Sequence, residues 1–273
     1  MPGRVIALLT DFGLHDHYVA SMKGVILGLA PEVTLVDITH EIAPQDVLSA
    51  ALELHACWRD FPPGSIFVVV VDPGVGTARR AVAAETGDRL FVAPDNGVLA
   101  IVLDEQPPTT VVEVTDPRYL RLPISHTFEG RDRFAPAAAW LARGAGVAAL
   151  GPRVADWVRL DVPKPRTGER AVVGEILTVD RFGNLISNIA PSLLEAACGA
   201  HRPLVRVADR QMVPFVDTYG NAPAGALCAL VGSSGRVEVA ANGDSAARLL
   251  GVGRGARVVI AADGPALDAA GSQ

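Results

Sequence analysis

The sequence has few cysteines, no long hydrophobic run and no excess of positive charge. Its three cysteines, in 273 residues, are odd in number and widely spaced, which argues against a disulfide framework and against a zinc site. We therefore expect buried, inert thiols at Cys57, Cys198 and Cys228. The longest strongly apolar run, Ile66 to Val71, has the length of a strand and is far too short to span a membrane.

The charge balance disfavours a nucleic-acid partner. Lys and Arg number 24 against 30 Asp and Glu, a formal net charge of -6, so no broad basic surface is expected. The six histidines show no HExxH-type spacing, and no metal site is predicted. An apolar run begins at residue 4 without a signal-peptide pattern, so the expected location is the cytoplasm, with no membrane partner.

The first 160 residues alternate between strand-like and helix-like spacing of apolar residues. Strands are expected at 4–10, 33–38, 66–71, 89–93 and 110–115. Helices are expected at 18–30, 46–58 and 133–143, the second capped by Asp46. Continuous apolar strands that alternate with helices predict an α/β fold with a Rossmann-like, mostly parallel sheet covered on both faces.

The pattern changes near residue 160. Residues 161–170 are polar, hold two prolines and a glycine, and are typical of a linker. Seven short strand-like runs follow, with helices expected only at 191–198 and 244–250. Many short strands at close spacing indicate a small β-barrel or sandwich. We predict an α/β catalytic domain at 1–160, a linker at 161–170 and a C-terminal β-barrel domain at 171–273.

Four polar clusters interrupt the hydrophobic sequence where strands should end. They read LTDFG (9–13), VVDPGVGTARR (70–80), APDNG (93–97) and TFEGRDRFAP (127–136). The ends of neighbouring strands converge in an open α/β sheet, and ligands bind there. One such cluster would be a turn, but four in the first half of the chain indicate an active site.

Each cluster admits a structural and a functional interpretation. Asp11 could accept hydrogen bonds from a ribose diol, or it could cap a helix or turn. Asp72 and Arg79 could belong to a site or form a structural ion pair. The loop after Asp72 lacks the GK[ST] ending of a Walker A motif, which excludes nucleoside triphosphate hydrolysis on that basis. Asp95 could belong to a simple turn, and Arg131 and Asp132 could merely tie their loop down.

The second half holds two further candidate segments. Residues 179–188 place Asp180, Phe182 and Asn184 around a glycine, which suits stacking and edge recognition of a purine, or a β-turn with a hydrophobic plug. Residues 232–243, GSSGRVEVAANG, form a glycine- and serine-containing loop followed by an alternating strand that holds Glu238.

Seven motifs in the right order resemble the S-adenosylmethionine (SAM) hydroxide adenosyltransferase family, whose relatives include fluorinase and chlorinase. They are TDFG with Tyr18 and Met22-Lys23-Gly24, DITHEI (37–42), DPGVGTxRR, PDNG, TFxGRDxFAP, DxFGNxxSN and SSGxVExAxNG. The resemblance implies an N-terminal α/β domain, a C-terminal β-barrel and a homotrimer, with the ligand between domains of neighbouring subunits. It also implies attack of water or hydroxide on the 5′-carbon of SAM, which yields adenosine and methionine without a metal or cofactor.

The resemblance assigns the catalytic residues. The family's water-activating Asp and Arg correspond to Asp72 and Arg79, and its His corresponds to Glu129, which is a departure. Our hypothesis is that Glu129 replaces the His, that Arg79 bridges two carboxylates, and that one of them takes the proton from water. The alternative is that Glu129 points away and that Asp72 with Arg79 suffices.

The resemblance also assigns binding residues. Asp11 should hold the ribose hydroxyls, and Phe182 should lie against the ligand. Three residues should contact the methionine or ribose end: Asp180, Asn184 and Ser233. Two more lie in the matching C-terminal loop: Glu238 and Asn242.

Three positions set this chain apart from the halogenating relatives. In the halogenating relatives, a Tyr occupies the position that matches Asp72 and a Trp the position that matches Gln45. In the fluorinase, a Ser occupies the position that matches Gly130. Hydrolysis is therefore favoured over halogenation or dehalogenation. A protein that senses SAM or adenosine without turnover is the other alternative.

Overall fold

A computed structural model describes residues 4–168, 170–199, 201–208 and 211–262 of the chain. The chain divides into two compact units, with the boundary between Asp161 and Val162. We refer to them as the first and the second unit. None of the helices in these described ranges is long and apolar enough to cross a membrane.

The first unit is built on a six-stranded sheet of order β2-β1-β3-β5-β4-β6. Its strands are β1 (Val5–Thr10), β2 (Thr34–Thr39), β3 (Ile66–Val70), β4 (Ala81–Thr86), β5 (Arg89–Pro94) and β6 (Thr110–Glu113). The neighbours β2, β1, β3 and β5 pair in parallel, while β4 runs antiparallel to both β5 and β6. The predicted mostly parallel sheet is therefore confirmed, with one reversed strand.

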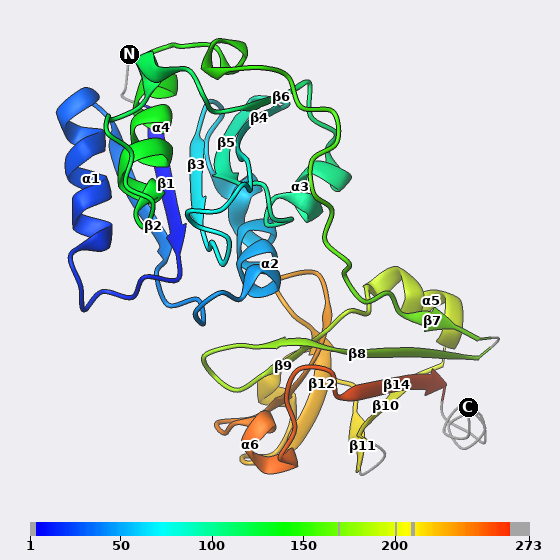
Figure 1. Cartoon of the computed structure of the whole chain (residues 1–273). Helices are drawn as coiled ribbons and strands as arrows, with labels where there is room; N and C mark the ends of the chain where they lie inside the picture. Colours follow the sequence, from blue (N-terminus) through cyan, green and yellow to red (C-terminus); the bar gives the residue numbers. More distant parts are fainter. Residues whose placement is uncertain (1–3, 169, 200, 209–210, 263–273) are drawn as a thin grey trace. The chain divides into compact units, whose positions relative to one another are not determined.

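Helices cover both faces of this sheet (Figure 1). They are α1 (Tyr18–Leu29), α2 (Val47–Cys57), α3 (Ala100–Glu105) and α4 (Ala135–Ala142). Side chains of a strand alternate between faces. Ile6 and Leu8 accordingly belong to a hydrophobic cluster with α1 and α4, whereas Ala7 and Leu9 belong to a second cluster with α2 and α3. Asp46 caps α2 as predicted, because its side chain accepts from the backbone N–H of Ser49 at 3.1 Å.

Strand β4 and helix α3 of the first unit were not predicted from the sequence. Strand β4 reads AVAAET, and alanine has low strand propensity, so its composition gave no strand signal. Helix α3 has six residues, too few to show a 3.6-residue period. Short helical turns complete the described chain at Trp58–Asp60, Pro117–Tyr119, Val147–Leu150 and Tyr219–Asn221. A π-helical turn, Gly130–Phe134, leads into α4.

The second unit is a barrel-like antiparallel sheet of order β11-β10-β14-β8-β9-β13-β12. Its strands are β7 (Arg166–Thr167), β8 (Ala171–Val179), β9 (Leu185–Ser187), β10 (Pro203–Val207), β11 (Gln211–Pro214), β12 (Leu227–Val231), β13 (Val237–Ala241) and β14 (Arg257–Ala262). A bridge between Phe215 and Ala229 joins the two ends of this path, so the sheet nearly closes. The helices α5 (Pro191–Cys198) and α6 (Ala246–Leu250) contribute to its core.

Two details differ from the sequence expectation. The segment predicted as a linker, 161–170, contains β7, which pairs with β8 through Arg166 and Val173. Cys198 and Cys228 are buried as expected, but Cys57 is only half-buried. Burial, with the nearby charges of Glu53 and Asp60, raises the pKa of the Cys57 thiol to about 11, so it is not a reactive thiolate at neutral pH.

Candidate active site

The polar clusters converge at the carboxyl edge of the parallel strands. Thr10, the last residue of β1, is in register with Val70 of β3, so Asp11 and Asp72 emerge side by side. Burial raises the pKa of Asp11, and the negative charge of Asp72 adds to the increase. A hydrogen bond from the backbone N–H of Gln45 lowers this pKa but does not cancel the increase. The two carboxylates therefore interact within one site.

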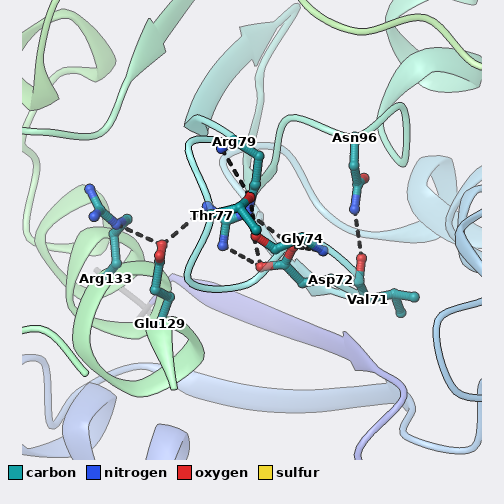
Figure 2. Close-up of polar contacts among 8 residues, drawn as sticks. All are labelled: Val71, Asp72, Gly74, Thr77, Arg79, Asn96, Glu129 and Arg133. Atoms are coloured by element: carbon teal, nitrogen blue, oxygen red, sulfur yellow. Dashed lines mark hydrogen bonds and ion pairs between the residues drawn. The ribbon is translucent and has the colours of Figure 1, made fainter. Parts of the chain in front are cut away.

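Arg79 bridges Asp72 and Glu129 (Figure 2). Its Nε donates to Oδ1 and Oδ2 of Asp72 at 2.9 and 3.0 Å, and its Nη2 donates to Oδ2. Its Nη1 donates to Oε2 of Glu129 at 3.1 Å. The predicted bridge between two carboxylates is thus present. Glu129 does not point away, so that part of the alternative is wrong, whereas the sufficiency of Asp72 with Arg79 stays a prediction.

This trio is almost withdrawn from solvent. The side chains of Arg79, Asp72 and Glu129 are 10%, 6% and 9% exposed. Burial by itself would lower the pKa of Arg79, but hydrogen bonds and charge from Asp72 and Glu129 raise it. Ion pairs in such surroundings interact far more strongly than on a surface. Arg79 is a fixed cation that holds two carboxylates in place.

Short-range contacts hold the loop that carries Asp72 and Arg79 (Figure 2). The backbone N–H of Gly74 donates to Oδ1 of Asp72, and the backbone N–H of Arg79 donates to the hydroxyl of Thr77. Asn96, which follows β5, donates from Nδ2 to the carbonyl of Val71 at 2.8 Å. The APDNG cluster therefore supports the site by tying two strand ends together.

Glu129 precedes the π-helical turn Gly130–Phe134. Such turns are rare and occur often at functional sites. Arg133, within the turn, donates from Nε to Oε2 of Glu129 at 2.8 Å and from Nη1 to the carbonyl of Val114 at 2.7 Å. Arg133 was not among the predicted site residues. Its spacing of four residues from Glu129 was the available signal, since that spacing pairs charges on a helix.

Two other acidic residues of the clusters have structural roles. Asp95 pairs with Arg80 at 2.7 Å and accepts from the backbone N–H of Val158, which confirms the structural interpretation of that turn. Asp132 is fully buried between Arg121 and Arg131, with a further hydrogen bond from the backbone N–H of Ser125 at 3.0 Å. It ties its loop down, as the second interpretation of that pair proposed.

Asp132 leads to a prediction about acid sensitivity. Burial acts to raise its pKa, but the hydrogen bonds from Arg131, Ser125 and Arg121 dominate and lower it from 3.8 to about 2. Because the folded-state value is the lower one, the stabilisation is complete above about pH 4 and is lost as the pH falls through about 2. It amounts to about 2 kcal/mol, since one pKa unit corresponds to about 1.4 kcal/mol.

Urea unfolding of wild type and Asp132→Asn at a series of pH values checks this. The difference in free energy of unfolding between wild type and the variant is expected to be largest at neutral pH and to decrease by about 2 kcal/mol on acidification. A gap that stays constant from neutral to acid pH would show that the charge on Asp132 contributes nothing.

A set of polar contacts around the buried His40 lies beside Asp11 and was also missed. The hydroxyl of Thr10 and Nδ1 of His40 are 2.8 Å apart, and Nε2 of His40 lies 3.1 Å from Oδ1 of Asp37. The backbone N–H of Phe12 donates to the hydroxyl of Thr10, and that of Gly13 donates to the carbonyl of His40. These contacts give the DITHEI motif a physical role, because they hold the backbone at Phe12 and Gly13.

In the second unit, Asp180, Phe182 and Asn184 form a tight turn between β8 and β9. Asp180 accepts from the backbone N–H groups of Phe182 and Asn184 at 2.9 and 2.8 Å, and from Nδ2 of Asn184 at 2.8 Å. The ring of Phe182 is 78% exposed in the single chain. A plugged turn would bury this ring, so the structure favours a ring that is available for a contact.

Glu238 joins the same region of the second unit. It is buried, and Tyr219 Oη donates a hydrogen bond to its Oε1. Burial raises the pKa of Glu238, and the charge of Asp180 adds to the increase. Burial and the bond to Glu238 likewise raise the pKa of Tyr219. Tyr219 was not predicted, because it lies in a separate loop with no motif around it.

The remaining two predicted binding residues, Asn242 and Ser233, differ in the surroundings of their side chains. Asn242 donates from Nδ2 to the carbonyl of Ala222 at 2.7 Å, so its amide holds a neighbouring loop. Ser233 is exposed, whereas the adjacent Ser234 has a buried hydroxyl with no hydrogen-bond partner in the described part of the chain. In those same ranges no group of three or more His, Cys, Asp or Glu residues is placed to hold a metal ion.

The fold and the site define a class of enzyme that joins a Rossmann-like α/β unit to a β-barrel unit, with a carboxylate–guanidinium–carboxylate trio at the sheet edge. Family models for the N-terminal and C-terminal domains of SAM hydroxide adenosyltransferases match residues 6–151 and 174–259. The chain belongs to this family.

Relatives of known name agree with this assignment. An (R)-S-adenosyl-L-methionine hydrolase from Salinispora tropica is 43% identical over 94% of this chain and 97% of that protein. A fluorinase from an Actinoplanes strain is 32% identical over 80% of this chain and 84% of that protein. The crystal structure of an uncharacterized conserved protein from Thermotoga maritima superimposes with a TM-score of 0.89 at 37% identity, and the match covers 94% and 99% of the two chains.

Proposed function

We propose that this protein hydrolyses SAM to adenosine and L-methionine by attack of water on the ribose 5′-carbon. The observation that carries the proposal is the buried trio in which Arg79 bridges Asp72 and Glu129. Its setting supports it, since the chain belongs to the SAM hydroxide adenosyltransferase family and shares 43% identity with a SAM hydrolase.

The chemistry demands little beyond alignment and proton removal. A new C5′–O bond forms as the C5′–S bond breaks. The electron pair of the C5′–S bond stays on sulfur, so the sulfonium cation becomes a neutral thioether as it leaves. Positive charge on sulfur disappears along the reaction, which a site shielded from water favours. The protein must hold water, C5′ and sulfur in line and accept a proton from the water.

The remaining side chains have binding roles in this proposal. Asp11 accepts hydrogen bonds from the ribose hydroxyls, and its carboxylate is already oriented by the backbone N–H of Gln45 at 2.8 Å. Phe182 supplies an exposed aromatic face. Asp180 and Glu238 supply negative charge suited to the cationic methionine end of SAM. Asn184 holds Asp180, while Ser233 offers a hydroxyl on an exposed loop.

Halogenation is disfavoured by the same geometry. Asp72 would repel a halide held beside it, and a side chain at position 130, such as the halide-binding serine of the fluorinase, would require Met22 and Phe128 to shift by a few tenths of an ångström. A Cβ added at Gly130 would lie 3.1 Å from Met22 Sδ and 3.3 Å from the ring of Phe128. Both distances are tighter than ordinary van der Waals contact.

The direct test is a product assay in water enriched in the heavy oxygen isotope, with and without chloride. We expect adenosine labelled at its 5′-hydroxyl, together with unlabelled methionine, at a rate that chloride does not change. The matched control is Asp72→Ala, for which we expect at least about a 100-fold slower release. Liquid chromatography with mass detection resolves the nucleosides.

Two results would contradict the proposal. Chloride-dependent 5′-chloroadenosine would identify a halogenating enzyme. SAM that stays intact and bound after gel filtration would identify a sensing protein. Two expectations from the family resemblance stay predictions: the absence of a cofactor, and a homotrimer, for which sedimentation should give three times the 28.5 kDa of the chain.

A further inference from the structure

We propose that Oε1 of Glu129 is the atom that takes the proton from the attacking water, and that Arg133 is the residue that positions it. This inference rests on the proposed hydrolysis and goes beyond it, because it chooses between the two carboxylates of the trio. It also adds a fourth residue that acts through Glu129.

The oxygens of Asp72 are already committed. Oδ1 accepts from the backbone N–H of Gly74 at 3.2 Å and from Nε of Arg79 at 2.9 Å. Oδ2 accepts from Nε of Arg79 at 3.0 Å and from Nη2 of the same guanidinium. Each oxygen thus already accepts two hydrogen bonds, which is its full capacity, so neither is left to accept from water. Asp72 therefore serves to hold Arg79 and to shape the field of the site.

Glu129 is held through one oxygen only. Nη1 of Arg79 and Nε of Arg133 both donate to Oε2, at 3.1 and 2.8 Å. No donor within the described residues reaches Oε1. A carboxylate oxygen has capacity for two hydrogen bonds, so Oε1 keeps its full accepting capacity. The side chain as a whole is 9% exposed, so little of it is open to solvent.

Arg133 is built to fix that arrangement. Its Nη1 donates to the carbonyl of Val114 at 2.7 Å, so the guanidinium is anchored to the segment after β6 while Nε holds Glu129. Arg79 is anchored in turn by Asp72. Glu129 is thus held between two cations that are each fixed at their far side. Rotation of its carboxylate would break both contacts, so the two cations hold the carboxylate in this orientation with one oxygen bound and the other free of protein donors in the described part of the chain.

Atoms and charges balance in this step. Water forms a bond to C5′, its proton moves to Oε1, and the C5′–S electron pair leaves with methionine. Glu129 becomes a neutral carboxylic acid that keeps its contacts to Arg79 and Arg133 through Oε2, and it returns the proton to solvent once adenosine departs.

Glu129→Gln tests the proton acceptor, because it preserves shape and keeps an oxygen for the two guanidiniums. We expect kcat to fall about 100-fold with little change in KM, and the decline of kcat at acid pH to disappear. An unchanged rate and pH profile would overturn the assignment. If wild type itself releases no adenosine in the same assay, the proposed function fails instead, so the two failures are distinguishable.

Arg133 is tested by a double-mutant cycle, because it acts only through Glu129. Arg133→Gln should lower kcat about 10-fold in the wild-type background and have no further effect beside Glu129→Gln. Arg133→Lys should recover part of the rate. Arg143→Gln, an exposed arginine just after α4, is the matched control and should match wild type. Equal losses from Arg133→Gln in both backgrounds would show a merely structural role and overturn the positioning assignment.

Discussion

Replacing Arg79 with methionine is expected to lower the free energy of unfolding by about 3–5 kcal/mol and turnover by about 1,000-fold. The stability loss follows because Asp72 is 6% exposed and Arg79 supplies its only salt bridge in the described part of the chain. A buried carboxylate without a counter-charge is costly, and its pKa rises. The lost stability should therefore recover in part as the pH is lowered.

Arg80→Met is the matched control for this experiment. Arg80 is the next residue, lies at the same sheet edge and pairs with Asp95 and Asp156. Its loss should lower stability but leave turnover per folded molecule close to wild type. Urea unfolding gives the stabilities, and initial rates at saturating SAM give turnover. If both arginine variants lost turnover to the same extent, the bridge between the carboxylates would have no special role.

Gly183→Ala is expected to destabilise the second unit by about 3 kcal/mol, through clash and backbone strain together. Gly183 has a φ of +84°, and an added Cβ would lie 2.0 Å from Ser245 Oγ and 3.0 Å from the Cα of Ser245. The neighbour cannot escape by rotating its side chain alone. Phe182 and Asn184 flank this glycine, so the variant should also bind SAM more weakly.

Gly225→Ala separates strain from clash. Gly225 also belongs to the second unit and has a φ of +75°, but an added Cβ would meet nothing within 4 Å. We expect it to cost only about 1–2 kcal/mol, the strain of the left-handed conformation. Calorimetry with an equilibrium binding assay measures both variants. Equal destabilisation of the two would mean that Ser245 gives way freely.

The fold could be predicted largely from hydrophobic periodicity. Continuous runs such as Ile66–Val70 cannot be half-exposed, so they must lie in a sheet covered on both sides. The many short strand-like runs at close spacing after Val162 predicted a small barrel or sandwich. The prediction missed two elements of the first unit, the alanine-rich strand β4 and the short helix α3. Their conformation depends on packing against neighbouring elements rather than on their own composition.

The site was predictable where one motif held both partners. Asp72 and Arg79 lie within one loop, so sequence distance anticipated their contact. Tyr219 was missed because its contact with Glu238 joins two separate segments of the chain, whereas Arg133 was missed although its spacing of four residues from Glu129, within one motif, was an available signal. Asn242 could be placed in the right loop from its motif, but its amide turns to the carbonyl of Ala222. Whether it touches SAM stays a prediction.

The division of the chain at Asp161 has a spectroscopic consequence. All three tryptophans, Trp58, Trp140 and Trp157, lie in the first unit. Their intrinsic fluorescence therefore reports on the first unit, because the sequence has no tryptophan after Val162. A Gly183 variant could lose its barrel while its emission spectrum stayed native. A tryptophan introduced at the exposed Phe182 position would give the barrel a fluorophore of its own, so that each unit could be followed separately in one protein.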